Sequence, residues 1–332
     1  MLEHIRRDFS QLGNPANSLI YTWFDLAQED ERIAFVGADS LGAYLVRDRY
    51  DPKYREWFWA KPERRRRMIM SGIQEANVGA FAGGLAQQGF KVFWQEMAWL
   101  FERAYNMIVC SICIDRYNVT LLGMAQGIGG GPTHQNLRDI ALFSAIPNMI
   151  VTAPVDAVEA KEIALFAHKY IGPMYIRAAV GAWGRGVPTF FEEGYTFRLG
   201  KAPLVRDGDD VTVIGIQEWV YNAILAAEIL SKEGIDVRVI DMSTIKPLDE
   251  QAIVRAAQET GAIVTAESTN IHGGLGSAVA GVVVEHNPVP MMRFALDDLF
   301  TQREVIPGKM AVHHRQTVDD LVAAIKATVK RK

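Results

Sequence analysis

Two polar residues that could carry catalysis lie in separate glycine-bearing motifs. Glu75 closes the sequence Gly-Ile-Gln-Glu that starts at Gly72, and His134 closes the sequence Gly-Pro-Thr-His that starts at Gly131. Each motif follows an apolar run typical of a strand and opens a predicted helix. Ligands of an open α/β sheet bind at the carboxyl ends of its strands, so both side chains lie where catalytic groups are expected.

Each of these residues also has a purely structural interpretation. A glutamate in the first turn of a helix is favoured by the helix dipole, and on position alone this is the commoner explanation of Glu75. The glycine-rich turn at 127–131 lets backbone amides approach an anionic or sugar ligand, and a histidine beside it suits proton transfer or binding of a hydroxyl group. The same turn could equally present His134 as an ordinary surface residue. No Lys-Ser or Lys-Thr follows the glycines, which excludes a Walker A loop.

Composition bounds the class of protein. The 332 residues are enough for about two domains, and 49% hydrophobic with 22% charged residues is typical of a soluble globular protein. A net charge of -4 gives no reason to expect a nucleic-acid partner. The sequence contains no apolar run of about 18 residues and its start lacks the apolar core of a signal peptide, so we expect a cytoplasmic protein without a membrane segment.

Three further motifs are expected to be structural. Four consecutive arginines at 64–67 indicate a solvated loop or a contact with another subunit, because no aromatic residues alternate with them as in a nucleic-acid surface. Cys110 and Cys113 form a CxxC motif inside an apolar stretch, and we expect both to pack in a buried helix, since a zinc site needs further ligands. His272, before two glycines, is expected to be a capping or interface residue.

The periodicity of the chain predicts an α/β fold of two doubly wound domains, the first with a mainly parallel sheet. The expected strands of the first domain are 33–36, 91–94, 119–122, 149–152 and 174–177, and its expected helices are 75–88, 99–114, 136–145 and 156–168. The expected strands of the second are 211–215, 237–240 and 262–265, and its expected helices are 218–232, 249–260, 276–285 and 318–330. Glycines without periodicity at 186–200 predict a linker between domains 1–185 and 201–332. Asp156, followed by Glu159, predicts a helix N-cap.

Several motifs, in their order and spacing, carry a family resemblance. They are residues 72–75, 101–106, 131–135 and 146–149 in the first half, and 241–249, Glu267 and 273–280 in the second. The first set resembles the pyrimidine-binding domain of the transketolase family of thiamine diphosphate enzymes. The second set resembles the C-terminal domain of that family. The resemblance covers nearly the whole chain.

This resemblance implies a function and a site. Glu75 would hydrogen-bond the aminopyrimidine ring of thiamine diphosphate, and His134 would contact substrate oxygens near the reacting carbon. The enzyme would move a two-carbon ketol unit from a ketose or ketose phosphate to an aldehyde, with the cofactor as electron sink. The implied cofactor-binding residues are Glu75, Trp99, Leu100, Phe101 and Arg103. The implied substrate-binding residues are Asp39, Gly130, His134 and Arg177.

Some positions depart from the family pattern. Gly130 stands where transketolases have an aspartate, two residues before the proline of the loop. Ala43 lies near the place of a serine that helps to bind a sugar phosphate, downstream of Asp39. Leu100 occupies the slot of the aromatic residue that packs on the pyrimidine, although Trp99 and Phe101 flank it. The donor and acceptor sugars therefore stay open.

The resemblance also implies a partner. The diphosphate and its Mg²⁺ are normally held by a separate N-terminal domain with a Gly-Asp-Gly loop, which this sequence lacks. We therefore expect a partner subunit that carries this domain and holds most of the Mg²⁺ ligands, with no metal site in this chain, in an assembly of two copies of each subunit. Three alternatives remain: the β subunit of a 2-oxo acid dehydrogenase, an enzyme like deoxyxylulose phosphate synthase, and a non-enzymatic assembly or regulatory protein that kept the fold.

Overall fold

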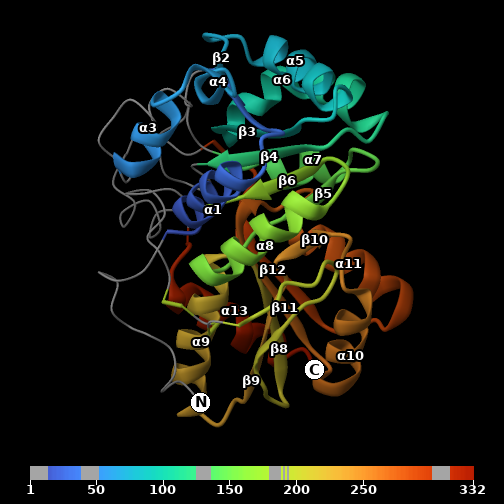
Figure 1. Cartoon of the computed structure of the whole chain (residues 1–332). Helices are drawn as coiled ribbons and strands as arrows, with labels where there is room; N and C mark the ends of the chain where they lie inside the picture. The colour runs from blue at the N-terminus through green and yellow to red at the C-terminus, as the bar shows by residue number, and fades with distance from the viewer. Residues whose placement is uncertain are drawn as a thin grey trace.

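Two sheets, each flanked by helices, organise the chain in a computed structural model (Figure 1). The structure describes residues 14–38, 52–124, 136–178, 188–189, 191–192, 194–300 and 315–332. Within these residues, no helix is both long and apolar enough to cross a membrane.

The first sheet has seven strands in the order β10-β5-β6-β4-β3-β1-β2. Their bounds are β1 (Ile33–Gly37), β2 (Met68–Met70), β3 (Lys91–Met97), β4 (Val119–Met124), β5 (Ile150–Thr152), β6 (Met174–Arg177) and β10 (Thr244–Lys246). All neighbours are parallel except β10, which pairs antiparallel with β5. The five listed strands and the doubly wound parallel sheet are confirmed, and β2 is the apolar run expected as a strand before the Gly72 motif, whereas β10 was not predicted.

Helices cover both faces of this sheet. Their bounds are α1 (Pro15–Glu29), α3 (Pro52–Trp59), α4 (Pro62–Arg65), α5 (Glu75–Gln87), α6 (Phe101–Ile108), α7 (Asp139–Ser144) and α8 (Ala157–Lys169). Residues of α1, α3 and α8 share one hydrophobic cluster, and residues of α5, α6 and α7 share another. The helix predicted at 99–114 consists of a 3₁₀ turn (Ala98–Leu100), α6 and a π-helical segment (Val109–Cys113) in succession.

The predicted cap of α8 is present. The Asp156 side chain accepts a hydrogen bond from the backbone N–H of Glu159 at 2.8 Å. The reciprocal contact differs from a standard capping box, because the Glu159 carboxylate accepts from the N–H of Val155, one residue before the cap, at 2.9 Å. Both carboxylates are buried.

The second sheet has five strands in the order β12-β11-β8-β9-β7. Their bounds are β7 (Leu204–Arg206), β8 (Val211–Gly215), β9 (Val237–Asp241), β11 (Ile263–Asn270) and β12 (Met291–Leu296), and its helices are α9 (Glu218–Ser231), α10 (Glu250–Thr260), α11 (Leu275–His286) and α13 (Val318–Val329). Only β7 runs antiparallel among these strand pairs. One face packs on α9 and α13, while α10 and α11 share the cluster that also contains α5 and α6, so the core is continuous between the sheets.

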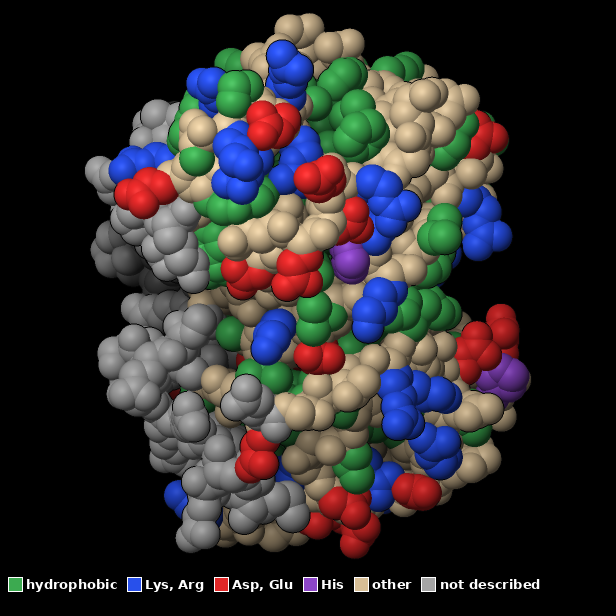
Figure 2. Space-filling view, in the orientation of Figure 1, with side chains coloured by type: hydrophobic (Ala, Val, Ile, Leu, Met, Phe, Trp, Pro, Cys, Tyr) green, Lys and Arg blue, Asp and Glu red, His purple; other side chains and the backbone are tan. Residues whose placement is uncertain are grey.

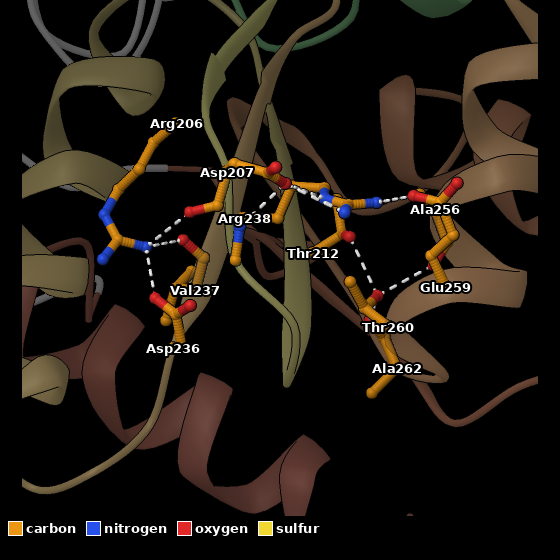
Figure 3. A network of polar contacts seen from close by, with 11 residues as sticks. Arg206, Asp207, Thr212, Asp236, Val237, Arg238, Ala256, Glu259, Thr260 and Ala262 are labelled. Carbon is orange, nitrogen blue, oxygen red and sulfur yellow. Dashed lines mark hydrogen bonds and ion pairs between the residues drawn. The ribbon is translucent and has the colours of Figure 1, made fainter. Parts of the chain in front are cut away.

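Polar contacts tie the second sheet together near the amino ends of β8 and β9 (Figure 3). Arg238 on β9 forms ion pairs with Asp207 at 2.9 Å and with Glu259 at the end of α10. The Thr212 hydroxyl on β8 lies 2.9 Å from the hydroxyl of Thr260. These contacts fix α10 to its sheet and lie outside the candidate site.

Candidate active site

Glu75 begins α5 at the carboxyl end of β2. The connecting turn contains Gly72 with a φ of 76°, a left-handed conformation that glycine adopts without strain. The turn brings the Glu75 side chain inward, and the residue is only 3% exposed. The structure thus places Glu75 where the sequence predicts it, at the carboxyl edge of the sheet.

The helix that starts with Glu75 packs unusually close to α6. A Cβ on Gly79 would lie 2.8 Å from the Cβ of Met107, and a Cβ on Gly83 would lie 2.1 Å from the backbone oxygen of Ser111. Both contact positions advance by four residues along each helix, so α5 and the helix that starts with α6 run in parallel. The small residues of α5 permit this close packing.

The close packing brings Arg103 beside Glu75. Glu75 Oε2 lies 3.6 Å from Arg103 Nη1, and the arginine side chain is 58% exposed while that of Glu75 is nearly covered. Glu75 Oε1 is buried and has no hydrogen-bond partner among the described residues. A buried carboxyl oxygen without a partner is costly, so this atom is suited to a ligand group that can share a proton with it.

The three residues after β3 differ in their surroundings. Phe101 is 0% exposed, and its ring meets Trp94 edge-on at 4.9 Å between centroids. Phe101 therefore packs in the core between α6 and the sheet. Leu100 is also buried, whereas Trp99 is half-buried on the 3₁₀ turn. Cofactor binding by these residues stays a prediction. For Phe101, burial in the core argues against direct contact with a cofactor.

Asp39, Gly130 and His134 lie outside the described residues. The structure does describe the segment that follows His134, and three elements hold it. Asn136 O accepts a hydrogen bond from Arg177 on β6 at 3.2 Å, and Leu137 O accepts from the N–H of Asn270 on β11 at 2.9 Å. Arg138 forms an ion pair with Glu102 of α6 at 2.8 Å. The chain next to His134 is therefore fixed to both sheets and to α6.

Arg177 makes further buried contacts that reach the second domain. Its side chain is 0% exposed, pairs with Asp139 at 2.9 Å, and donates to the Gln217 side chain and to Ser268 O at 3.2 Å in the second domain. Gln217 donates in return to Arg177 O at 3.1 Å. Arg177 therefore joins the two domains. None of these contacts supports its role in substrate binding, which stays a prediction. The sequence around Arg177 gives no sign that it joins the domains, because a buried arginine can be recognised only from the residues that it contacts in the fold.

The turn after the two glycines at 273–274 holds a carboxylate of the chain itself. Glu267 accepts hydrogen bonds from the N–H groups of Leu275 at 2.9 Å and Gly276 at 2.7 Å, at the start of α11. A Cβ on Gly274 would lie 2.2 Å from Glu267 Oε2, which explains the glycine. Burial raises the pKa of Glu267 although these donors oppose the shift. His272 is exposed next to this turn.

A cluster of buried carboxyl groups at the domain junction was missed by the sequence analysis. Glu159 accepts from the Ser243 hydroxyl at 2.6 Å and from the Tyr195 hydroxyl at 3.1 Å. Burial raises the pKa of Glu159 to about 7. Burial, followed by the charge of Glu159, raises the pKa of Asp241 well above its usual range. The sequence does not reveal this cluster, because Glu159 on α8 and Asp241 on β9 are far apart along the chain.

The CxxC motif is only half buried. Cys113 is 2% exposed, and burial raises the pKa of its thiol to about 12. Cys110 is exposed, so the expectation that both cysteines pack in the core was wrong for Cys110, which falls on the outer side of the helical segment. Both thiols are free. Among the described residues, no three His, Cys, Asp or Glu side chains are grouped as metal ligands.

Comparison with known proteins agrees with this architecture. Residues 22–182 match the family model of the transketolase pyrimidine-binding domain, and residues 200–305 match that of the transketolase C-terminal domain. A 6-deoxy-6-sulfo-D-fructose transketolase subunit from Clostridium sp. is 36% identical over 289 residues, which cover 84% of each chain. An apulose-4-phosphate transketolase subunit from Phocaeicola vulgatus is 34% identical over 282 residues, 83% of this chain and 85% of that one.

A solved structure agrees as well. It is described as a split-gene transketolase in an inactive β4 tetramer, is 32% identical, and superposes with a TM-score of 0.85 over 96% of this chain and 99% of that chain. The matches cover both sheets and the connection between them. The chain therefore belongs to the transketolase family and spans its pyrimidine-binding and C-terminal domains.

Proposed function

We propose that this chain is one subunit of a thiamine-diphosphate-dependent transketolase that moves a two-carbon ketol unit from a ketose to an aldehyde. The observation that carries the proposal is the Glu75 carboxyl group, buried at the carboxyl edge of the first sheet with Oε1 unpartnered among the described residues. The relatives named as transketolase subunits align with this chain over most of the length of both proteins, which supports this activity.

The described residues fit the aminopyrimidine half of the cofactor. Thiamine diphosphate, when bound, supplies the electron sink that allows the carbon–carbon bond to break and form. Glu75 would hold a proton between Oε1 and a ring nitrogen, and Arg103 would keep the carboxyl group in place from its other oxygen. Trp99 and Leu100, on the 3₁₀ turn after β3, would bind the ring, and the anchored segment after His134 would hold that histidine toward substrate oxygens.

The remaining half of the site would come from a partner subunit. The chain has no Gly-Asp-Gly loop, and the described residues hold no grouped metal ligands, so Mg²⁺ and the diphosphate would bind mainly to the partner. Two copies of each subunit would form the cytoplasmic enzyme. A small sugar is the substrate class, and the glycine at 130 argues for a donor or acceptor that differs from the usual phosphorylated pentose.

A reconstituted enzyme tests this function. The chain would be co-expressed with the product of the neighbouring gene and assayed for magnesium-dependent binding of thiamine diphosphate and for ketol transfer. Glu75→Gln should lower turnover at least 100-fold while leaving thermal unfolding and partner binding unchanged. Glu250→Gln is the matched control, because Glu250 also begins a helix but is exposed.

Three results would overturn the proposal. Full activity of Glu75→Gln would refute the role of the carboxyl group. Turnover of a 2-oxo acid with an artificial electron acceptor, in place of ketol transfer, would favour a dehydrogenase subunit. A complex that binds no thiamine diphosphate would favour the non-enzymatic alternative.

A further inference from the structure

A cavity of about 390 Å³ opens at the edge of the first sheet opposite Glu75. It is formed by residues at the amino ends of β1, β2 and β3, by α4 and by the last turn of α5. Its lining residues are Gln28, Glu31, Ala34, Trp57, Lys61, Glu63, Arg64, Arg66, Arg67, Ile69, Leu85 and Phe90. Leu85 and Glu75 lie on the same helix, roughly 15 Å apart along its axis. The cavity is therefore separate from the proposed active site.

Positive charge dominates this cavity. Four cationic side chains line it, against the carboxylates of Glu31 and Glu63. Among the described residues, none of the four forms an ion pair, in contrast to Arg177 and Arg238 elsewhere in the fold. Figure 2 shows Lys and Arg side chains gathered where Figure 1 places α4, with acidic side chains next to them.

Two of the cations are held in place before any ligand binds. Arg67 donates to the backbone oxygens of Ala27 at 3.0 Å and Asp30 at 3.1 Å, at the end of α1. Arg64 donates to Trp57 O at 3.1 Å, and its guanidinium lies 4.2 Å from the centre of the Trp57 ring. Burial lowers the pKa of Arg67, and the charge of Arg64 adds to this shift although Glu31 opposes it. An anion in the cavity would reduce the repulsion between the two arginines.

The other two cations, Lys61 and Arg66, are exposed. No hydrogen bond of either side chain is found in the described part of the chain, so both can turn toward a ligand. Arginine and lysine at one site suit phosphate oxygens, because arginine offers paired donors and lysine a compact charge. The fixed and the free cations together provide more donors than one small anion needs.

Part of the cavity wall is apolar and is formed by Ile69, Leu85, Phe90 and Trp57. A cavity of this volume falls within the range of small-molecule sites. We propose that this cavity binds a small phosphorylated compound, whose phosphate meets the four cations and whose remaining part lies against the apolar wall.

Binding of simple probes to the full chain tests the proposal. Pyrophosphate, AMP and adenosine would be titrated by calorimetry at low salt. We expect AMP and pyrophosphate to bind and adenosine to bind at least tenfold more weakly, because it lacks the phosphate. Raising the salt to 0.5 M should weaken pyrophosphate binding, since the contacts are ionic.

Charge-neutral variants locate the site. Lys61→Gln/Arg66→Gln should weaken pyrophosphate binding at least tenfold without altering thermal unfolding, because neither side chain has a described partner. Arg65→Gln is the matched control from the same run of arginines. Arg65 lies over Trp59 at 5.8 Å and outside the cavity, so this variant should bind within twofold of wild type.

Other outcomes would overturn the proposal. Equal weakening by Arg65→Gln and by the double variant would show unspecific attraction to a basic surface. A chain that binds none of the phosphorylated probes, but loses partner association in the double variant, would show that an acidic segment of the partner subunit occupies the cavity instead.

Discussion

Glu75 and Arg103 face each other across the first turns of two parallel helices, with Oε2 and Nη1 3.6 Å apart. Gly79 faces Met107 one turn later, and Gly83 faces Ser111 one turn after that. The two helices thus touch along three successive turns. Because protein interiors are close-packed, such a pair moves as one body, and the carboxyl group keeps its position relative to the sheet.

Gly83→Ala should separate these helices. The new Cβ would meet the Ser111 oxygen at 2.1 Å, and the backbone oxygen cannot turn away as a flexible side chain could. We expect a loss of about 2–3 kcal/mol in unfolding free energy, together with lower thiamine diphosphate affinity. Gly84→Ala is the control, because nothing lies within 4 Å of its Cβ, and it should stabilise α5 by about 0.5–1 kcal/mol. Equal stability of the two variants in urea unfolding would contradict the close packing.

Arg177→Met should destabilise the chain strongly. It leaves the buried Asp139 carboxylate without its cation, a change that typically costs about 3–5 kcal/mol. Chemical denaturation measures this loss, and the double variant Arg177→Met/Asp139→Asn should lose less than the sum of the single variants. If Arg177→Met unfolds like wild type but raises KM for a phosphorylated substrate alone, the residue binds substrate instead.

Asp241→Asn should flatten the pH dependence of stability. Free carboxyl groups titrate near about 4, but burial raises the pKa of Glu159 to about 7 and that of Asp241 well above its usual range. The folded chain therefore binds more protons than the unfolded one. The resulting contribution to the free energy of unfolding is fully present below the pKa values of the unfolded state. It is lost as the pH rises through the pKa values of the folded state.

Thermal unfolding between pH 5 and pH 8 measures this effect. Between pH 5 and pH 8 the free energy of unfolding should fall by on the order of 1–3 kcal/mol more in wild type than in Asp241→Asn, because one pKa unit corresponds to about 1.4 kcal/mol. Asp209→Asn, at an exposed aspartate, should behave like wild type. A wild-type protein that gains stability toward pH 8 would show that the cluster is ionised in the folded state.

Gly274→Ala should disturb the start of α11. Its Cβ would lie 2.2 Å from Glu267 Oε2 and 2.6 Å from Thr269 Oγ1, so the carboxylate would lose its place against the helix amides. We expect destabilisation of about 1–3 kcal/mol. Gly281→Ala, in the same helix with nothing within 4 Å of the new Cβ, should be neutral or slightly stabilising. Urea unfolding of both variants separates the two effects.

Local patterns were sufficient for the elements that carry Glu75. Buried parallel strands have continuous apolar runs, and Asp156 at the start of α8 is recognisable because its side chain caps its own helix. The position of Glu75 follows from the same patterns, since a strand, a glycine turn and a helix are all contiguous in sequence. The close approach of α5 to α6 follows from the small residues of α5.

Contacts between distant parts of the chain could not be predicted in this way. β10 is three residues long, and its pairing with β5 depends on the arrangement of both domains. Arg177 meets Gln217 and Ser268 only after folding, so its burial leaves no mark on the sequence around it. The clustering of Glu159 with Asp241 has the same origin. The four arginines at 64–67 were expected in a loop or subunit contact, and the cavity that Arg64, Arg66 and Arg67 line depends on the fold of α1 and α5.

The pairing of β10 with β5 limits how this polypeptide could be divided into shorter ones. A cut within 186–200 looks suitable from sequence, since it falls between the two sheets. The downstream fragment would then carry away the edge strand of the upstream sheet, leaving β5 with unpaired backbone groups along one side. Two fragments made in this way should aggregate when expressed singly and recover when mixed. The two sheets therefore cannot be divided between separate polypeptides by a cut in this linker without loss of a strand from the first sheet.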